Sequence, residues 1–397
     1  MADFYDRDSR LGFSRAEGKL GYTSLVLMIV AFCVTAPMAS AQTGRARASC
    51  TDCSLELVRV ARLGAESDPE LLGSLLHVAV DSRGNIAAEN STGDGVLIFD
   101  RTGRYQRRVG RRGSGPGELS SMFDVMFGPG DSLWVMNGPF SLVYSPAFAF
   151  VRSSRRVAEQ WGTAVPLSDG TLVSASMTGI DASHLIFLSQ DATKKPLLID
   201  EGREAYHPPG QRFPICSACL VPLLAAGRES NSFWSLNPNS YRVRQWSSRG
   251  VATTDFVVRT PRFPVFRDDD RGDPAVQRLR PQIHSLGVAL DGVLLVAGET
   301  SSTSWKQNPQ RAGLAGTARR KGGVQSRDDS AAVEIDRRNR ATVVQVLDPR
   351  TGRILGERQF DGRHLKIVRH LAFENGTDSD GFVHIDVWQV QLKDRGK

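Results

Sequence analysis

The chain has 397 residues, of which 40% are hydrophobic, and it contains 38 Gly and 19 Pro, a composition that suits many short strands and turns. Its formal charge is +7, but residues 301–340 alone hold nine Lys or Arg against four Asp or Glu. Because the positive charge is concentrated in one segment, we exclude a nucleic-acid-binding protein and expect no nucleic-acid partner.

Residues 1–41 resemble a targeting sequence. The apolar run Leu25–Val34 is followed by Ala39-Ser40-Ala41, which fits the small-x-small rule for signal-peptide cleavage. The region before this run has no net positive charge, so an uncleaved membrane anchor over residues 20–41 stays an alternative. Both alternatives predict export to the periplasm or the cell exterior, with the N-terminal segment in contact with the membrane during export.

Residues 42–53 form a linker that contains the first of two Cys-x-x-Cys pairs. In an exported protein, four remaining cysteines favour disulfides, although the spacing leaves all three pairings open. A four-thiolate zinc site and a redox pair are the alternatives, but the gap between the pairs is long for zinc and no βαβ context is predicted for redox chemistry. The candidate disulfide residues are Cys50, Cys53, Cys216 and Cys219.

The chain from residue 54 onward is built from a degenerate repeat of short apolar runs separated by Gly-centred turns. Its clearest copy runs from Leu75 to Val80, turns at Asp81–Asn85, and continues through Ile86–Glu89 and Val96–Phe99. Repeated strand and turn units of this size are typical of the blades of a β-propeller.

The first copy is followed by Phe99–Tyr105 and then by the Gly-rich loop Val109–Leu119. This loop is not a phosphate-binding P-loop, because Gly117 is followed by Glu118 and Leu119 rather than by Lys and Ser or Thr. We expect a turn between two blades. With this loop, the chain resembles the exported bacterial six-bladed β-propeller proteins related to NHL-repeat domains, strongly over residues 54–136 and more weakly to the end. The resemblance implies a ring fold that binds a ligand or a protein.

Further copies bring the number of units to six, and a β-sandwich is the alternative fold. The last unit begins at Leu371–Glu374 and lacks a fourth strand, whereas the alternating run Leu55–Leu63 is left without a unit. We therefore predict an all-β, six-bladed propeller over residues 54–397, with its last blade closed by this N-terminal strand. The later copies centre on Asp124–Val135, Ala164–Val173, Ser232–Trp246, Leu286–Val296 and Leu371–Trp388.

Residues 301–340 interrupt the fifth unit between its second and third strands. Their low apolar content and their Gly, Ser and Arg bias predict a long mobile loop, and a docking element for an acidic partner is the alternative.

Alignment of the units places His77, Asp124 and His370 at one blade position, on neighbouring blades. Two imidazoles and a carboxylate at one end of the central channel are a candidate site for a divalent metal, zinc or calcium. Related ring enzymes, including a lyase and lactonases, hold metals on this axis. The alternative is that these polar groups line a hydrated channel and no cofactor binds. The other histidines, His184, His207, His284 and His364, are assigned no role.

The sequence contains no Gly-x-Ser-x-Gly elbow and no His-Glu-x-x-His motif. We therefore expect an exported, monomeric, non-catalytic binding or scaffold protein that binds a protein, peptide or glycan through loops on one propeller face. The alternative is a metal-dependent hydrolase or lyase with its site at the central channel.

Overall fold

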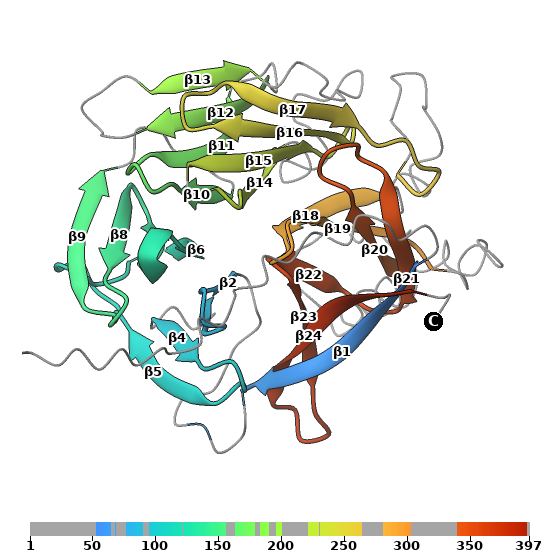
Figure 1. Cartoon of the computed structure of the whole chain (residues 1–397). Coiled ribbons are helices and arrows are strands. Elements are labelled where there is room, and N and C mark those ends of the chain that lie inside the picture. The colour runs from blue at the N-terminus through green and yellow to red at the C-terminus, as the bar shows by residue number, and fades with distance from the viewer. Residues whose placement is uncertain are drawn as a thin grey trace, which may run out of the picture. The chain divides into compact units, whose positions relative to one another are not determined.

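The computed structural model describes residues 53–64, 68, 77–89, 95–120, 122–155, 163–178, 183–189, 196–200, 221–229, 231–263, 281–302 and 340–394. All of them belong to the compact unit Gly44–Lys397, in which they form six four-stranded antiparallel sheets arranged as a ring (Figure 1). This architecture confirms the predicted six-bladed β-propeller. The only helical segment of the described residues is a 3-10 turn, η1 (Pro129–Asp131), and none of their helices is long and apolar enough to cross a membrane.

Blades 1 to 5 each use four consecutive strands, ordered from the channel outward. Blade 1 consists of β2 (Val78–Val80), β3 (Ile86–Glu89), β4 (Val96–Phe99) and β5 (Tyr105–Val109). Blade 2 consists of β6 (Met122–Phe127), β7 (Leu133–Asn137), β8 (Phe140–Tyr144) and β9 (Phe150–Arg155). Blade 3 consists of β10 (Ala164–Pro166), β11 (Leu172–Thr178), β12 (Ser183–Ser189) and β13 (Leu197–Asp200). Blade 4 consists of β14 (Leu223–Ala226), β15 (Ser232–Asn237), β16 (Arg242–Ser247) and β17 (Ala252–Val257). Blade 5 consists of β18 (Gln282–Val288), β19 (Leu294–Ser301), β20 (Arg340–Leu347) and β21 (Ile354–Asp361).

Blade 6 joins the two ends of the propeller and closes the ring. It contains β22 (Leu365–Val368), β23 (Leu371–Thr377) and β24 (Val383–Asp394), and its outermost strand is β1 (Cys53–Leu63), paired antiparallel with β24. Figure 1 shows β1 in blue beside β24 in red. Arg62 and Asp386 are register partners, and the Arg62 guanidinium donates to both Asp386 oxygens at 2.8 and 3.1 Å. The predicted closure by the N-terminal strand is confirmed.

The prediction that Leu371–Glu374 is the innermost strand of the last blade is wrong. The innermost strand is β22, and β23 occupies the second position of the sheet. The interruption of blade 5 falls where it was predicted, since β19 ends at Ser301 and β20 begins at Arg340. The interior of that insertion, the leader over residues 1–41 and the linker up to Asp52 lie outside the described residues.

The hydrophobic core is divided among the interfaces between neighbouring blades. One cluster joins β1, β23 and β24 of blade 6 to blade 1 through Leu63, Phe373 and Ile86, and comparable clusters join the other neighbouring pairs. Because a middle strand packs against a blade on each side, β3 and β4 are buried at every position. This two-sided burial explains why β4 and the first three residues of β3 form apolar runs instead of alternating with polar residues.

Candidate functional site

The innermost strands of blades 1, 2 and 6 end at the same end of the central channel. Arg369, directly after β22, donates to the Val80 carbonyl at the end of β2 at 3.1 Å. Ser82, also after β2, donates through its backbone N–H and its hydroxyl to Asp131, which follows β6, at 2.8 and 2.7 Å. The beginnings of these three strands therefore lie together at the opposite end of the channel.

At that opposite end, His77 and Asp124 are in direct contact. His77 immediately precedes β2, and its Nδ1 lies 3.0 Å from Oδ1 of Asp124 on β6. Since a carboxylate accepts hydrogen bonds, Nδ1 is the donor in this contact, and Nε2 does not take part in it. The His77 side chain is 33% exposed, so solvent reaches this residue.

A buried carboxylate, Glu89, lies on the other side of the imidazole. Glu89 is the last residue of β3, its side chain is 8% exposed, and its Oε2 lies 3.8 Å from Nε2 of His77. Among the described residues this oxygen has no hydrogen-bond partner, and such buried groups are rare in folded proteins. The 3.8 Å between Oε2 and Nε2 leaves no room for an atom between them, but a polar ligand atom beside the pair can lie within hydrogen-bond distance of both.

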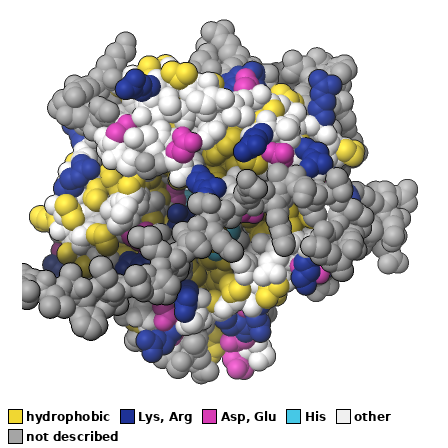
Figure 2. Space-filling model, in the orientation of Figure 1, with side chains coloured by type: hydrophobic (Ala, Val, Ile, Leu, Met, Phe, Trp, Pro, Cys, Tyr) yellow, Lys and Arg dark blue, Asp and Glu magenta, His cyan; other side chains and the backbone are white. Residues whose placement is uncertain are grey.

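Lys366, the second residue of β22, supplies a buried amine to the same site. Burial lowers the pKa of Lys366, and the charges of Asp124 and Glu89 oppose this shift. Burial raises the pKa of Glu89, while His77 and Lys366 oppose that rise. We refer to His77, Glu89, Asp124 and Lys366 as the axial cluster. Figure 2 shows histidine and charged side chains near the middle of the face. Titratable groups with perturbed pKa values that lie close together are typical of functional sites.

A second cluster extends the polar end of the channel toward blade 5. His284 is the extra residue of a β-bulge in β18 and stacks on His364, with ring centroids 5.5 Å apart. Glu299 contacts both His364 and Arg340. Burial raises the pKa of Glu299, but the hydrogen bond and the positive charges from these partners outweigh it, and the resulting pKa is about 2. Burial lowers the pKa of His284 to about 4, and its buried Nε2 has no hydrogen-bond partner. We refer to His284, Glu299, Arg340 and His364 as the blade 5 histidine cluster.

Of the three predicted metal ligands, the structure brings together His77 and Asp124 but not His370. His370 lies in the turn between β22 and β23, next to Arg369 and therefore at the other end of the channel. In the part of the chain that the structure describes, no three His, Cys, Asp or Glu side chains are grouped to hold a metal ion.

Sequence reasoning missed Glu89 and Lys366 and assigned no role to His284 and His364. The available signal was a charged residue within an otherwise apolar four-residue run, Ile86–Glu89 and Leu365–Val368. Of the four cysteines proposed to form disulfides, Cys53 begins β1 and is disulfide-bonded, and Cys50, Cys216 and Cys219 lie outside the described residues, so the pairing of the cysteines stays a prediction.

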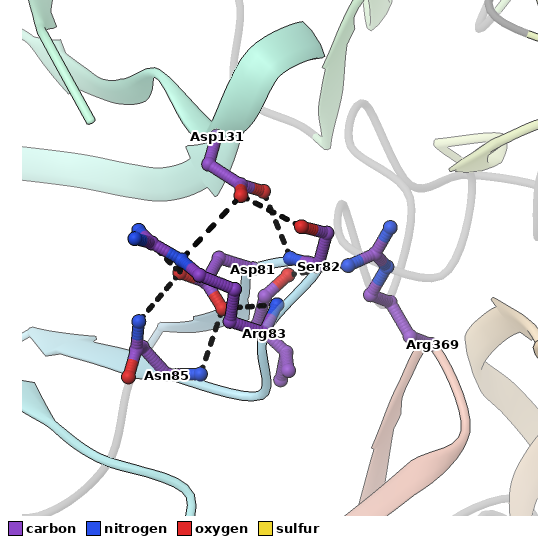
Figure 3. A network of polar contacts seen from close by, with 7 residues as sticks. Asp81, Ser82, Arg83, Asn85, Asp131 and Arg369 are labelled. Atoms are coloured by element: carbon purple, nitrogen blue, oxygen red, sulfur yellow. Dashed lines mark hydrogen bonds and ion pairs between the residues drawn. The ribbon is translucent and has the colours of Figure 1, made fainter. Parts of the chain in front are cut away.

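A network of hydrogen bonds and ion pairs connects the turns at the end of the channel near Arg369 (Figure 3). The buried Asp81 accepts the backbone N–H groups of Arg83 and Asn85 at 2.9 and 2.7 Å, which shapes the turn after β2. Arg83 also contacts Asp131 of blade 2 at 3.7 Å. The acidic groups of this network are satisfied by partners of their own turn and of blade 2, so we assign it to holding blades 1, 2 and 6 in place.

The Gly-rich loop links blade 1 to blade 2, as its sequence indicated. Leu119 donates to the Arg111 carbonyl at 2.8 Å, and the Tyr144 hydroxyl of blade 2 donates to the Gly117 carbonyl at 2.9 Å. Gly117 has a φ of +75°, and a Cβ at this position would lie 3.0 Å from Phe150. Glycine is required here by conformation and by close approach, since side chains rarely adopt a positive φ.

Comparison with known proteins supports the architecture. The model of the DUF5128 family, described as a 6-bladed beta-propeller, matches residues 67–136. A DUF4221-family protein from Bacteroides vulgatus is similar in structure, with a TM-score of 0.57 and 10% identity over 86% of this chain and 99% of that chain. The virginiamycin B lyase of Staphylococcus aureus, solved in a catalytically inactive form with quinupristin, has a TM-score of 0.42 and 9% identity over 85% of this chain and 99% of that chain.

No curated protein sequence matches the chain significantly. At this level of identity the structural neighbours establish the fold alone. The strand order, the family match and the first of these neighbours agree: the chain is a six-bladed β-propeller.

Proposed function

We propose that the chain is an exported, non-catalytic binding propeller and that its ligand binds at the axial cluster. The observation that carries this proposal is the buried Glu89 Oε2, which has no hydrogen-bond partner among the described residues and lies 3.8 Å from Nε2 of the partly exposed His77. Export rests on the targeting pattern of residues 1–41.

The chemistry of the cluster favours a ligand hydroxyl, and of the ligand classes expected from the sequence this indicates a glycan. Glu89 Oε2 and His77 Nε2 are both hydrogen-bonding atoms, and when the pair holds one proton, one atom donates and the other accepts. A hydroxyl both donates and accepts, so a single sugar hydroxyl beside the pair can bond to both groups. The site also lies inside the ring, where a small polar ligand such as a sugar fits better than the surface of a folded protein.

A panel of neutral, N-acetylated and acidic sugars, tested by thermal shift and then by titration calorimetry on the full chain, checks this proposal. We expect at least one sugar to raise the melting temperature, and we expect His77→Ala and Glu89→Gln to abolish the effect. His370→Ala is the matched histidine control, and it should leave sugar binding unchanged. A sugar that binds His77→Ala as tightly as the parent would place the site elsewhere, and a panel without any binder would refute the glycan assignment.

A further inference from the structure

The outer edges of blades 1 and 2 carry an unusual excess of arginine. Strand β5 and its flanking turns contain Arg104, Arg107, Arg108, Arg111 and Arg112, and β9 contains Arg152 and Arg155, all of them exposed. Neither β5 nor β9 contains an acidic residue, whereas the outer strands of blades 3, 4 and 5 contain Asp200, Asp255 and Glu357, respectively.

Only part of this charge is neutralised within the protein. Asp100 pairs with Arg104 at 3.7 Å, and Glu118 pairs with Arg111 at 2.7 Å. Among the residues that the structure describes, no carboxylate pairs with Arg107, Arg112, Arg152 or Arg155. Arg152 also donates to the Ser154 hydroxyl at 2.8 Å and lies 5.3 Å from the centroid of the Trp134 ring, so its charge is held in place but not neutralised.

Exposed apolar side chains lie beside these arginines. Phe140, Phe150 and Val151 of blade 2 are 42%, 37% and 57% exposed. Phe140 is the register partner of Arg155, so these two side chains lie next to each other on one face of the blade. Figure 2 shows hydrophobic and basic side chains next to one another along the left edge, where Figure 1 places β9.

The edges of the two blades form one continuous surface. Arg107 of β5 donates to the Ala147 carbonyl of blade 2 at 3.3 Å and lies 5.9 Å from the centroid of the Phe148 ring. The Gly-rich loop that carries Arg112 packs against Phe150 through Gly117. We refer to Arg107, Arg112, Arg152, Arg155, Phe140, Phe150 and Val151 as the arginine rim.

Protection of the strand edges alone does not account for this surface. Charged residues, most often lysine, prevent edge strands from pairing with other chains, but exposed Phe and Val side chains would work against that purpose. Every basic residue of the rim is arginine, whose planar guanidinium binds phosphate with two parallel hydrogen bonds. Basic and apolar side chains interleaved on one surface are typical of binding to the headgroup region of an anionic membrane.

We propose that the arginine rim docks the propeller on an anionic phospholipid surface, with the guanidinium groups on lipid phosphates and Val151 and the Phe side chains at the acyl boundary. Only one part of this proposal rests on the proposed export of the chain, namely the choice of a membrane rather than another anionic surface. It concerns the outer edge of the ring and does not involve the axial cluster.

Vesicle binding of the full chain tests the proposal, with phosphatidylcholine vesicles compared with vesicles that also contain phosphatidylglycerol. The hydrophobic segment at residues 25–34 and its flanking residues are the same in the parent, the variants and the control, so a difference in binding among these proteins does not come from that segment. We expect tighter binding to the anionic vesicles and a loss of this preference at high salt.

Two variants and a control separate the contributions. The triple variant Arg107→Ser, Arg112→Ser and Arg155→Ser should lose about 100-fold in affinity for the anionic vesicles, because each arginine near such a surface contributes about fivefold. Val151→Ser should cause a smaller loss that salt does not change. The control, Arg249→Ser with Val251→Ser, removes an exposed arginine and an exposed valine next to β17 of blade 4 and should bind like the parent.

Equal binding of the parent to both vesicle types would overturn the proposal, and so would a triple variant that binds like the control while its melting temperature is unchanged. Binding to a soluble polyanion such as heparin without binding to anionic vesicles would assign the rim to a different partner. Sugar binding is measured separately, so failure of this proposal and failure of the proposed function are distinguishable.

Discussion

Replacement of Leu63 by alanine tests whether β1 holds the ring closed. Leu63 is fully buried at the end of β1, where it pairs with Ile385 of β24 and packs with Val78 and Leu97 of blade 1. Its side chain therefore contributes both to the last sheet and to the interface between the last blade and the first.

The expected cost follows from the size of the deletion. Leu→Ala removes three carbons, each worth about 0.8 kcal/mol of transfer free energy, which gives about 2.4 kcal/mol. The cavity left among rigid neighbours adds to this, so we expect the free energy of unfolding to fall by about 3 to 4 kcal/mol. Val58 lies on the same strand but is 40% exposed, so Val58→Ala should cost about 0.5 kcal/mol.

Urea unfolding followed by tryptophan fluorescence measures both variants, with the slope of the transition as a check that the same surface is exposed on unfolding. A Leu63→Ala variant that unfolds within about 1 kcal/mol of Val58→Ala would refute the reasoning. That result would mean that β1 can leave the ring without disturbing the interface with blade 1.

Three other outcomes follow from the buried polar groups. The Tyr241 hydroxyl donates to Gln345 at 2.6 Å inside the interface between blades 4 and 5, so Tyr241→Phe should lower the free energy of unfolding by about 1 to 3 kcal/mol in the same urea assay. Burial lowers the pKa of His284 to about 4 from its usual 6.5, so the unfolded chain takes up the proton first and stability falls as the pH drops from 6.5 to 4. His284→Gln should therefore flatten the pH dependence of the melting temperature over that range, and an unchanged slope would contradict the assignment. Elemental analysis of protein purified without chelator should find substoichiometric zinc and calcium, since no described residues are grouped as ligands, and one equivalent of either metal would reopen the enzyme hypothesis.

The fold could be predicted because each blade repeats the same local signals. The turn Asp81–Asn85, for example, combines a buried Asp81 that accepts two backbone N–H groups with Gly84 at a φ of +87°. Such turns are specified by their own residues, so they can be recognised from the amino-acid sequence alone. The closing strand was predictable for a different reason: closure leaves no strand of the ring without a partner, and Leu55–Leu63 was the only run left over.

The innermost strand of blade 6 was missed because its sequence does not resemble a buried strand. Leu365–Val368 is four residues long and has Lys366 at its second position. An amine is tolerated there because Asp124 and Glu89, on blades 2 and 1, bring negative charge toward it across the channel. This compensation comes from residues more than 200 positions away, so no local pattern reveals it.

That single strand decides which residues meet on the axis. Neighbouring blades were ordered correctly, since ring closure places blade 6 beside blade 1. His77 and Asp124 meet because His77 directly precedes β2 and Asp124 lies on β6, and both of these inner strands could be recognised in the sequence. The sequence pattern indicated β23 as the inner strand and therefore predicted His370 at the site instead of Lys366. Lys366 is an amine at one end of the channel, whereas His370 is an imidazole at the other end. The prediction of the fold is unaffected by such an error because β22 and β23 belong to the same antiparallel sheet. The prediction of the site is affected, because only the innermost strand lines the channel and its first residues set the charge of that end. With Lys366 in place the cluster contains an amine and two carboxylates around one imidazole, all of them groups that form hydrogen bonds with polar atoms.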